Sequence, residues 1–155
     1  MYQRILVPLD GSQFSEAVLP HAEKLALALN VELVLLHVEV TPVPEFDAPI
    51  ATLAPPKEIK KQRVDIKSYI KNTCSRLENK GARATYQLRE GPVAETILDA
   101  AEAMQADFIA MSTHGHTGVL RLLLGSVAEQ VVHRSKIPVM LIRPQAARMR
   151  KRGKG

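Results

Sequence analysis

The stretch Ile5-Leu6-Val7-Pro8-Leu9-Asp10-Gly11-Ser12 decides the fold class of this chain. Its five consecutive apolar residues are too few for a helix of ordinary length, but they suit a β-strand that is buried on both faces. The Asp-Gly-Ser that follows is typical of a tight turn. A strand buried on both faces needs helices on each side, so this stretch predicts a parallel α/β sheet.

The rest of the chain alternates between strand patterns and helical patterns. Residues 15–30 have a helical pattern, in which Pro20 removes one backbone donor and predicts a kink or a late start of the helix. In residues 58–80 apolar side chains recur every three or four positions, and Gly81 fits the C-terminal cap of that helix. The other expected elements are helices at 91–105 and 126–134, strands at 31–40, 82–88, 107–112 and 138–142, and a proline-rich loop at 41–56. The last helix begins with Ser126-Val-Ala-Glu129, which matches a capping box.

This order of elements predicts a single doubly wound sheet of five parallel strands, with helices on both faces and right-handed crossovers. The fold class is therefore α/β, and we expect the strand order 3-2-1-4-5. In such a sheet a ligand binds at the carboxyl ends of the strands, near the point where the strand order reverses. That point lies between strands 1 and 4, so the turns at residues 10–12 and 112–126 are expected to face it.

The length and the cysteine content limit the class of protein. A chain of 155 residues has the length of one domain, and Cys74 has no second cysteine with which to form an internal disulfide. No apolar run approaches the ~18 residues of a membrane span, and the apolar run near the start is too short for a signal peptide. We therefore expect a cytoplasmic protein without a membrane partner.

The net charge of +5 comes from the end of the chain. Residues 145–155 carry five basic residues and no acid, whereas basic and acidic residues balance in residues 1–144. We expect a folded domain at 1–144 and a solvated basic tail at 145–155, the alternative being a tail that contacts nucleic acid or anionic lipid. An aromatic content of 4% argues against a base-stacking surface for nucleic acid.

Residues 111–126, Met-Ser-Thr-His-Gly-His-Thr-Gly-Val-Leu-Arg-Leu-Leu-Leu-Gly-Ser, carry the strongest chemical signal. Their glycines allow a close approach of the backbone to a ligand, and Ser126 stands at a helix start, where unpaired N–H groups attract anions. His114, His116 and Arg121 add positive or switchable charge, and no acid occurs between Phe108 and Ala128. The pattern is typical of a phosphate-binding loop; the alternative is a glycine-rich connection needed only for packing.

The same segment resembles the nucleotide-binding signature of the universal stress protein family, Gly-x2-Gly-x9-Gly-Ser/Thr. Gly115, nine residues and then Gly125-Ser126 match its second half, whereas Ser112 stands where the first glycine is expected. If that position needs a positive φ, serine costs about 1–2 kcal/mol; if it does not, the hydroxyl can donate to a phosphate. Residues 5–12, 35–38 and 138–142 resemble strands 1, 2 and 5 of the family, so the resemblance covers residues 3–144.

The resemblance implies a Rossmann-like fold of the adenine nucleotide α-hydrolase type and a stress-response module that binds ATP, or alternatively AMP or a cyclic nucleotide. Mg²⁺ would be held only through the phosphates. The family also implies a homodimer formed by the fifth strand, through Pro138, Val139, Met140, Leu141 and Ile142. The ligand residues it implies are Asp10 and the Val38 backbone for adenosine, Ser112, His114, Gly115, Gly125, Ser126 and Val127 around the phosphates, and Pro8, Leu9 and Met111 as the pocket lining.

Several simpler assignments stay open from the residues alone. Asp10 also fits a turn-capping role, and Leu9 and Met111 fit core packing. His114 and His116, with His133 as a third ligand, are an alternative as a metal site, which we do not expect. The chain has no P-loop, no Gly-x-Gly-x-x-Gly and no Gly-x-Ser-x-Gly motif, and we expect no catalytic residue.

Three functions therefore compete. The first is a nucleotide-binding module with at most slow ATP hydrolysis. The second is a phosphoryl-cleaving enzyme of the same fold, for which only Asp10 supplies a carboxylate. The third is a dimeric interaction module that binds no nucleotide.

Overall fold

The computed structural model describes residues 1–40, 56–113 and 125–144, and for residues 56–64 it describes the helical backbone only. Residues 41–55 of the loop predicted at 41–56, the loop residues 114–124 and the tail at 145–155 lie outside the described residues, and Pro56 is the first residue of α2. The elements are β1 Arg4–Pro8, η1 Ser15–Val18, α1 Leu19–Leu29, β2 Glu32–Glu39, α2 Pro56–Asn79, β3 Arg83–Glu90, α3 Val93–Ala103, β4 Phe108–Ser112, α4 Ser126–Arg134 and β5 Val139–Ile142.

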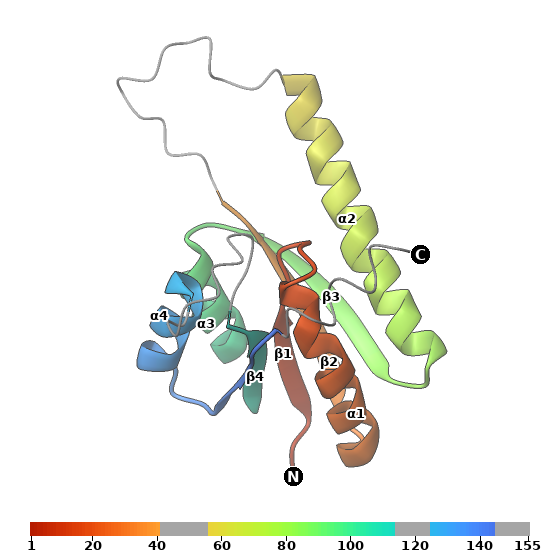
Figure 1. The fold of residues 1–155 in the computed structure, drawn as a ribbon, viewed down its shortest axis with the longest axis vertical. Coiled ribbons are helices and arrows are strands. Elements are labelled where there is room, and N and C mark those ends of the chain that lie inside the picture. Colours follow the sequence, from red (N-terminus) through yellow and green to blue (C-terminus); the bar gives the residue numbers. More distant parts are fainter. Residues whose placement is uncertain (41–55, 114–124, 145–155) are drawn as a thin grey trace.

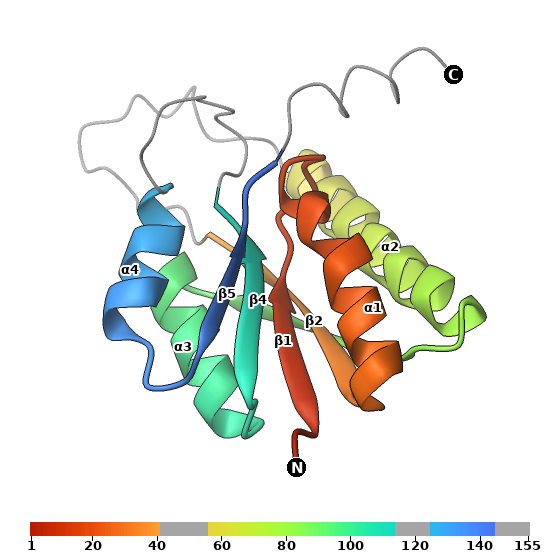
Figure 2. The same ribbon diagram turned by 60° about the horizontal axis from the view of Figure 1, so that its bottom comes forward.

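The five strands form one parallel sheet in the order β3-β2-β1-β4-β5, which confirms the predicted topology. Helices α1 and α2 cover one face of the sheet, and α3 and α4 cover the other (Figures 1 and 2). The chain starts at the amino edge of the sheet (Figure 2), so the connections that follow β1, β2 and β4 leave from the opposite edge.

Alternation along the strands supplies the two cores. Ile5 and Val7 of β1 are fully buried in the cluster formed with α1 and α2, and Leu6 between them is fully buried in the cluster formed with α3 and α4. Burial on both faces is the reason that the three central residues of this strand, Ile5–Val7, are all apolar. Cys74 of α2 is a buried free thiol in the first cluster, as expected of a small apolar side chain.

The helix ends follow local sequence rules in two places. Pro20 lies in the first turn of α1, and the residues before it form a 3₁₀ turn, so the late start of the helix is confirmed. Gly81, with a φ of +93°, ends α2, and its N–H donates to the carbonyl of Glu78 while the Ala82 N–H donates to that of Leu77. These two bonds form a Schellman motif, which satisfies carbonyls at the end of the helix.

The predicted capping box at the start of α4 is wrong. Gly125 is the N-cap, Ser126 is already the first helical residue, and no side chain caps this end. The Glu129 N–H donates to the Gly125 carbonyl at 2.9 Å, and the Gly125 N–H donates to the Thr113 carbonyl at 2.7 Å. That bond to the end of β4 sets where the helix begins, so a local sequence pattern does not decide it.

The sheet has two edge strands, β3 and β5. Pro138 precedes β5, and its carbonyl accepts the Ile109 N–H at 3.0 Å, so the proline lies at the start of the strand as expected. All four residues of β5 are partly exposed. Within the described ranges, no helix is both long and apolar enough to cross a membrane.

Candidate functional site

The ladder between β1 and β4 ends before the carboxyl edge of the sheet, which is where a ligand-binding crevice is expected in a doubly wound sheet. The two strands pair only at Ile5 with Phe108 and at Leu6 with Ile109. Beyond that point β1 continues beside β2 as far as Pro8, and β4 continues beside β5 as far as Ser112. The two polar turns singled out from the sequence therefore lie on opposite sides of the point where the strand order reverses.

The turn after β1 is closed by its own side chains. The Ser12 N–H donates to Asp10 Oδ1 at 2.8 Å, which is the Asx turn considered from the sequence. The Ser15 N–H donates to Ser12 Oγ at 3.1 Å, and the Ser15 hydroxyl donates to the Ser12 carbonyl at 3.0 Å. Gly11 has a φ of +87°, a conformation in which a residue with a Cβ is strained. The backbone of this turn thus fixes the position of Asp10.

His37 is a buried polar residue of this edge that the sequence analysis did not single out. It lies on β2 with 8% exposure, and its Nδ1 is 2.9 Å from the Leu9 carbonyl oxygen. Because a carbonyl only accepts, Nδ1 is the protonated nitrogen of the ring in this contact. The Leu9 N–H donates to the Leu36 carbonyl at 2.8 Å, so β2 holds both polar groups of the residue before Asp10. A histidine within an otherwise apolar strand was the available signal.

The peptide of Val38 faces the crevice. In a parallel strand, successive peptide groups point alternately to the two neighbouring strands. The Leu36 carbonyl accepts a bond from Leu9 on the β1 side, and the Glu39 carbonyl accepts one from Gly91 on the β3 side. The peptide of Val38 therefore points to the β1 side, where the ladder has already ended at Pro8 and Leu36. A backbone N–H and C=O on this side of the strand can form hydrogen bonds with a ligand.

The start of α4 lies next to the end of β4, through the bond between Gly125 and Thr113. The N–H groups of Ser126, Val127 and Ala128 stand in the first turn of the helix, where no intrahelical acceptor exists. Together with the helix dipole they favour an anion at this end. Ser126 is exposed and Ser112 is 7% exposed, so the two hydroxyls of the signature differ in their access to solvent.

Ser112 occupies the first glycine position of the signature without backbone strain. It is the last residue of β4, pairs with Ile142 of β5, and has no positive φ. A side chain is therefore tolerated here, and the cost considered for a positive φ does not arise.

The structure brings most of the predicted ligand residues to this one edge. Met111 is 6% exposed in the core beneath α3 and α4, and Leu9 is 3% exposed in the core on the other face. Their packing roles are thus established by burial, whereas a contact with ligand stays a prediction. The residues at this edge are Pro8, Leu9, Asp10, Val38, Met111, Ser112, Gly125, Ser126 and Val127; His114 and Gly115 lie outside the described residues.

A metal site formed by three histidines was the alternative considered from the sequence. No group of three His, Cys, Asp or Glu side chains with metal-binding geometry occurs among the described residues. His133, the third ligand considered for a metal, has a 74% exposed side chain and lies 3.9 Å from Glu129 on its own helix. Its two proposed partners, His114 and His116, are outside the described residues.

Comparison with known proteins gives consistent matches over most of the chain. The model of the Universal stress protein family matches residues 1–143. Universal stress protein MJ0531 of Methanocaldococcus jannaschii is 31% identical over 144 residues, which cover 92% of this chain and 83% of that relative. The solved structure of MJ0577, from the same organism, is 30% identical, has a TM-score of 0.79, and matches over 94% of this chain and 99% of its own.

Two more distant solved structures share the fold and contain adenine nucleotides. A universal stress protein in complex with cAMP has a TM-score of 0.68 at 22% identity, with 92% of this chain and 97% of that chain covered. A universal stress protein from Archaeoglobus fulgidus in complex with dAMP has a TM-score of 0.64 at 22% identity, with 91% and 98% covered.

Proposed function

Because this chain belongs to the universal stress protein family, we propose that it binds an adenine nucleotide, ATP in the first place, in the crevice between β1 and β4. The observation that carries the proposal is the bond between the Gly125 N–H and the Thr113 carbonyl. It brings the anion-attracting start of α4 to the same edge as the Asp10 turn and the Val38 peptide. An anion site, a carboxylate and a backbone edge are the groups needed for phosphate, ribose and base, respectively.

Each part of the site has a separate role in this proposal. The first-turn N–H groups of α4 and the Ser126 hydroxyl bind the phosphates, with Gly115 and His114 contributing from the loop before α4. The carboxylate of Asp10 accepts from the ribose hydroxyls, and the peptide of Val38 reads the base. Mg²⁺, when present, is bound through the phosphates. The complexes of relatives with cAMP and dAMP support the ligand class, and AMP or a cyclic nucleotide are the alternatives to ATP.

We further propose that the protein is a binding module rather than an efficient hydrolase. Rapid phosphoryl transfer needs a residue that orients the attacking group and a cation at the γ-phosphate. The carboxylate of Asp10, directly after β1, already closes the turn by accepting the Ser12 N–H. Hydrolysis of ATP should therefore be slow. We also propose that the protein is a cytoplasmic homodimer that pairs through β5.

The decisive experiment is a calorimetric titration of ATP into protein freed of carried-over ligand by unfolding and refolding. We expect saturable binding with one nucleotide per chain. Asp99→Ala, on the exposed face of α3, serves as the control for loss of a carboxylate elsewhere, and it should bind like the wild type. Absence of binding up to millimolar ATP would leave the non-nucleotide interaction module as the function.

A phosphate-release assay on the same preparation separates the module from the enzyme. We expect fewer than a few turnovers per hour with Mg²⁺ present. Rapid release that depends on Asp10 would instead establish the phosphoryl-cleaving enzyme.

A further inference from the structure

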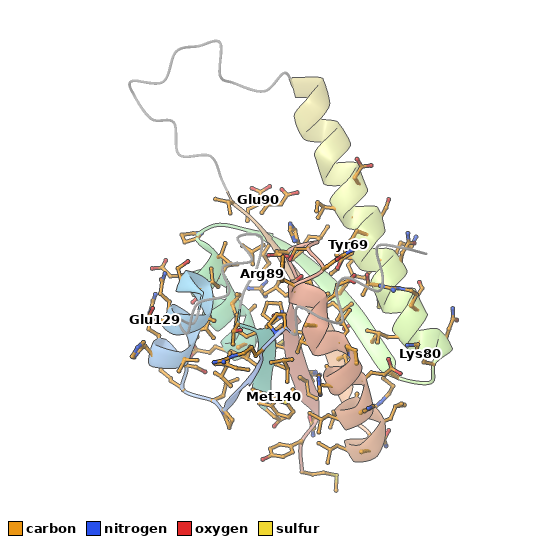
Figure 3. The ribbon with its side chains drawn as sticks, viewed as in Figure 1. Tyr69, Lys80, Arg89, Glu90, Glu129 and Met140 are labelled. Atoms are coloured by element: carbon orange, nitrogen blue, oxygen red, sulfur yellow. The ribbon has the colours of Figure 1, made fainter. Side chains whose placement is uncertain are left out.

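Helix α2 reaches the turn after β1 through three side chains. The Tyr69 hydroxyl donates to Glu16 Oε1 at 2.8 Å, and Arg76 Nη2 lies 3.5 Å from the same oxygen. Ile66 packs over the turn itself, with its Cδ1 3.6 Å from the place that a Cβ on Gly11 would occupy. Figure 3 shows Tyr69 between α2 and the start of the connection from β1 to α1.

A continuous set of bonds joins Glu16 to the carboxylate of Asp10. The Glu16 N–H donates to the Ser12 carbonyl at 3.3 Å, and the Ser12 N–H donates to Asp10 Oδ1 at 2.8 Å. The Ser15 hydroxyl, next to Glu16, donates to the same Ser12 carbonyl and accepts the Asp10 N–H at 3.3 Å. A displacement of Glu16 therefore moves Ser15 and Ser12, and with them the carboxylate.

Tyr69 is the strongest link between α2 and this turn. Burial, followed by the hydrogen bond to Glu16, raises the pKa of Tyr69 far above its usual value, so the hydroxyl stays protonated and remains a donor. The Tyr69 carbonyl accepts the Thr73 hydroxyl at 2.9 Å, within α2. The Arg76 side chain is 62% exposed, so its ion pair with Glu16 is screened by solvent and contributes little.

We propose that Tyr69 is a positioning residue for nucleoside recognition: through Glu16 it holds the turn after β1 in the geometry that presents Asp10 to the ligand. The proposal rests on the nucleotide-binding function proposed above. Its distinctive consequence is a split between the two halves of the ligand. Loss of the Tyr69 hydroxyl disturbs the nucleoside half, which uses Asp10, and leaves the phosphate half, which uses the start of α4, unchanged.

The test is calorimetry on the full-length, ligand-freed protein with ATP, adenosine and inorganic tripolyphosphate as the three probes. Tyr69→Phe should weaken ATP and adenosine binding by about five- to tenfold, the effect of one ordinary hydrogen bond. Tripolyphosphate affinity should change less than twofold. Glu16→Ala should repeat this pattern, whereas Glu16→Gln should bind like the wild type because its amide oxygen still accepts from Tyr69.

A matched control removes a different tyrosine hydroxyl from the same side of the sheet. Tyr86 of β3 packs, half-buried, against the cluster beneath α1 and α2 and makes no described contact with the turn, so Tyr86→Phe should leave all three affinities unchanged. Amide hydrogen exchange supplies a measurement without ligand. The Ser12 and Ser15 amides should exchange faster in Tyr69→Phe and Glu16→Ala than in the wild type, while the far-UV circular dichroism stays that of the folded protein.

Two results would overturn the positioning role while leaving the proposed function intact. One is wild-type affinity and wild-type exchange in Tyr69→Phe; the other is an equal loss of ATP and tripolyphosphate, which indicates general destabilisation. If the wild type binds neither ATP nor adenosine, the proposed function is wrong and the positioning role fails with it.

Discussion

Asp10 and Gly125 lie on the two sides of the crevice; Asp10 acts through its carboxylate, and Gly125 through its backbone. The carboxylate of Asp10 closes its own turn through the Ser12 N–H, and a carboxylate has enough acceptor sites to serve a ligand as well. Gly125 has a φ of −56° and a ψ of 154°, a conformation open to any residue. Its glycine is therefore not required by the backbone, and a requirement for it would come from what approaches the helix start.

A substitution at Gly125 should therefore affect ligand binding more than it affects folding. Gly125→Val should leave the far-UV circular dichroism and the thermal midpoint close to those of the wild type, because its φ is negative. ATP binding should weaken at least tenfold, about 1.4 kcal/mol, since the added side chain stands where the phosphates approach the first-turn N–H groups. Calorimetry measures the affinity, and wild-type affinity in a folded variant contradicts the assignment of the phosphates to this end of α4.

At the scale of elements, the end of helix α2 and the start of helix α4 show what local sequence can and cannot predict. Gly81 was correctly expected as a cap because the bonds that end α2 involve only its own last residues. The start of α4 at Ser126 was also predicted correctly, but the capping box was wrong, because Gly125 is the N-cap and its N–H donates to Thr113, just after β4. His37 was missed because its partner, the Leu9 carbonyl, follows a different strand, β1, and is distant in the sequence.

The strand order, by contrast, could be predicted from the alternation of apolar strands and helices, because a doubly wound parallel sheet allows few topologies. The placing of Asp10, Ser112 and Ser126 at one edge followed from that order. The Tyr69–Glu16 contact could not be predicted, because it joins residues that are distant in the sequence and have no periodic pattern in common.

Replacing the cap of α2 should cost stability without any change in the crevice. Gly81→Ala places a Cβ on a residue with a φ of +93°, at the distance of an ordinary contact, 3.9 Å, from Leu27 Cδ2. The cost is therefore conformational, about 1–2 kcal/mol, and should lower the thermal midpoint by roughly 2–8 °C. Gly125→Ala is the matched control: its φ is negative, so it should lower the midpoint in differential scanning calorimetry less than Gly81→Ala does.

Strand β1 is tied to β4 at its amino end by the carboxylate of Asp107. This group accepts the N–H groups of Arg4, at 2.8 Å, and of Gln3, and these bonds lower the pKa of Asp107 below its usual value. A lowered pKa in the folded state stabilises the protein above the pKa of the unfolded chain, about 3.9, and this contribution is lost as the pH falls through the folded value.

Asp107→Asn should therefore be less stable than the wild type at pH 7, and the difference should shrink as the pH falls from about 4 toward 2. Urea unfolding at a series of pH values measures it. The asparagine keeps an acceptor oxygen and removes the charge, so a difference that stays constant over this range would mean that the charge of Asp107 is not responsible.

At the scale of the whole molecule, the sheet ends in two edges of unequal length. Edge strand β3 has eight residues with charged side chains at both ends, whereas β5 has four apolar residues, all partly exposed. A short apolar edge of this kind favours pairing with another strand unless something covers it. Two-fold pairing of β5 would cover it in both copies. We also propose that residues 1–144 form the folded domain and that residues 145–155 are a basic tail.

Met140 tests this pairing. It lies in the middle of β5 and packs against the core beneath α1 and α2 (Figure 3). Met140→Lys should yield monomers or insoluble protein, as judged by light scattering at micromolar concentration, while the wild type gives the mass of a dimer. Val132→Lys, at a 40% exposed position on α4, is the control and should remain dimeric. A dimeric Met140→Lys would place the interface elsewhere.

Because β1 is the central strand, its two neighbours are synthesised on the ribosome at different times. Strand β2 can pair with β1, and β3 with β2, as soon as residue 90 has emerged. The other neighbour of β1 is β4, which begins only at residue 108. At about 5–20 residues per second, one side of β1, whose central residues are all apolar, stays without a neighbouring strand for roughly one to a few seconds. In that interval the same flank that later borders the crevice is a target for chaperones and for other unfinished chains.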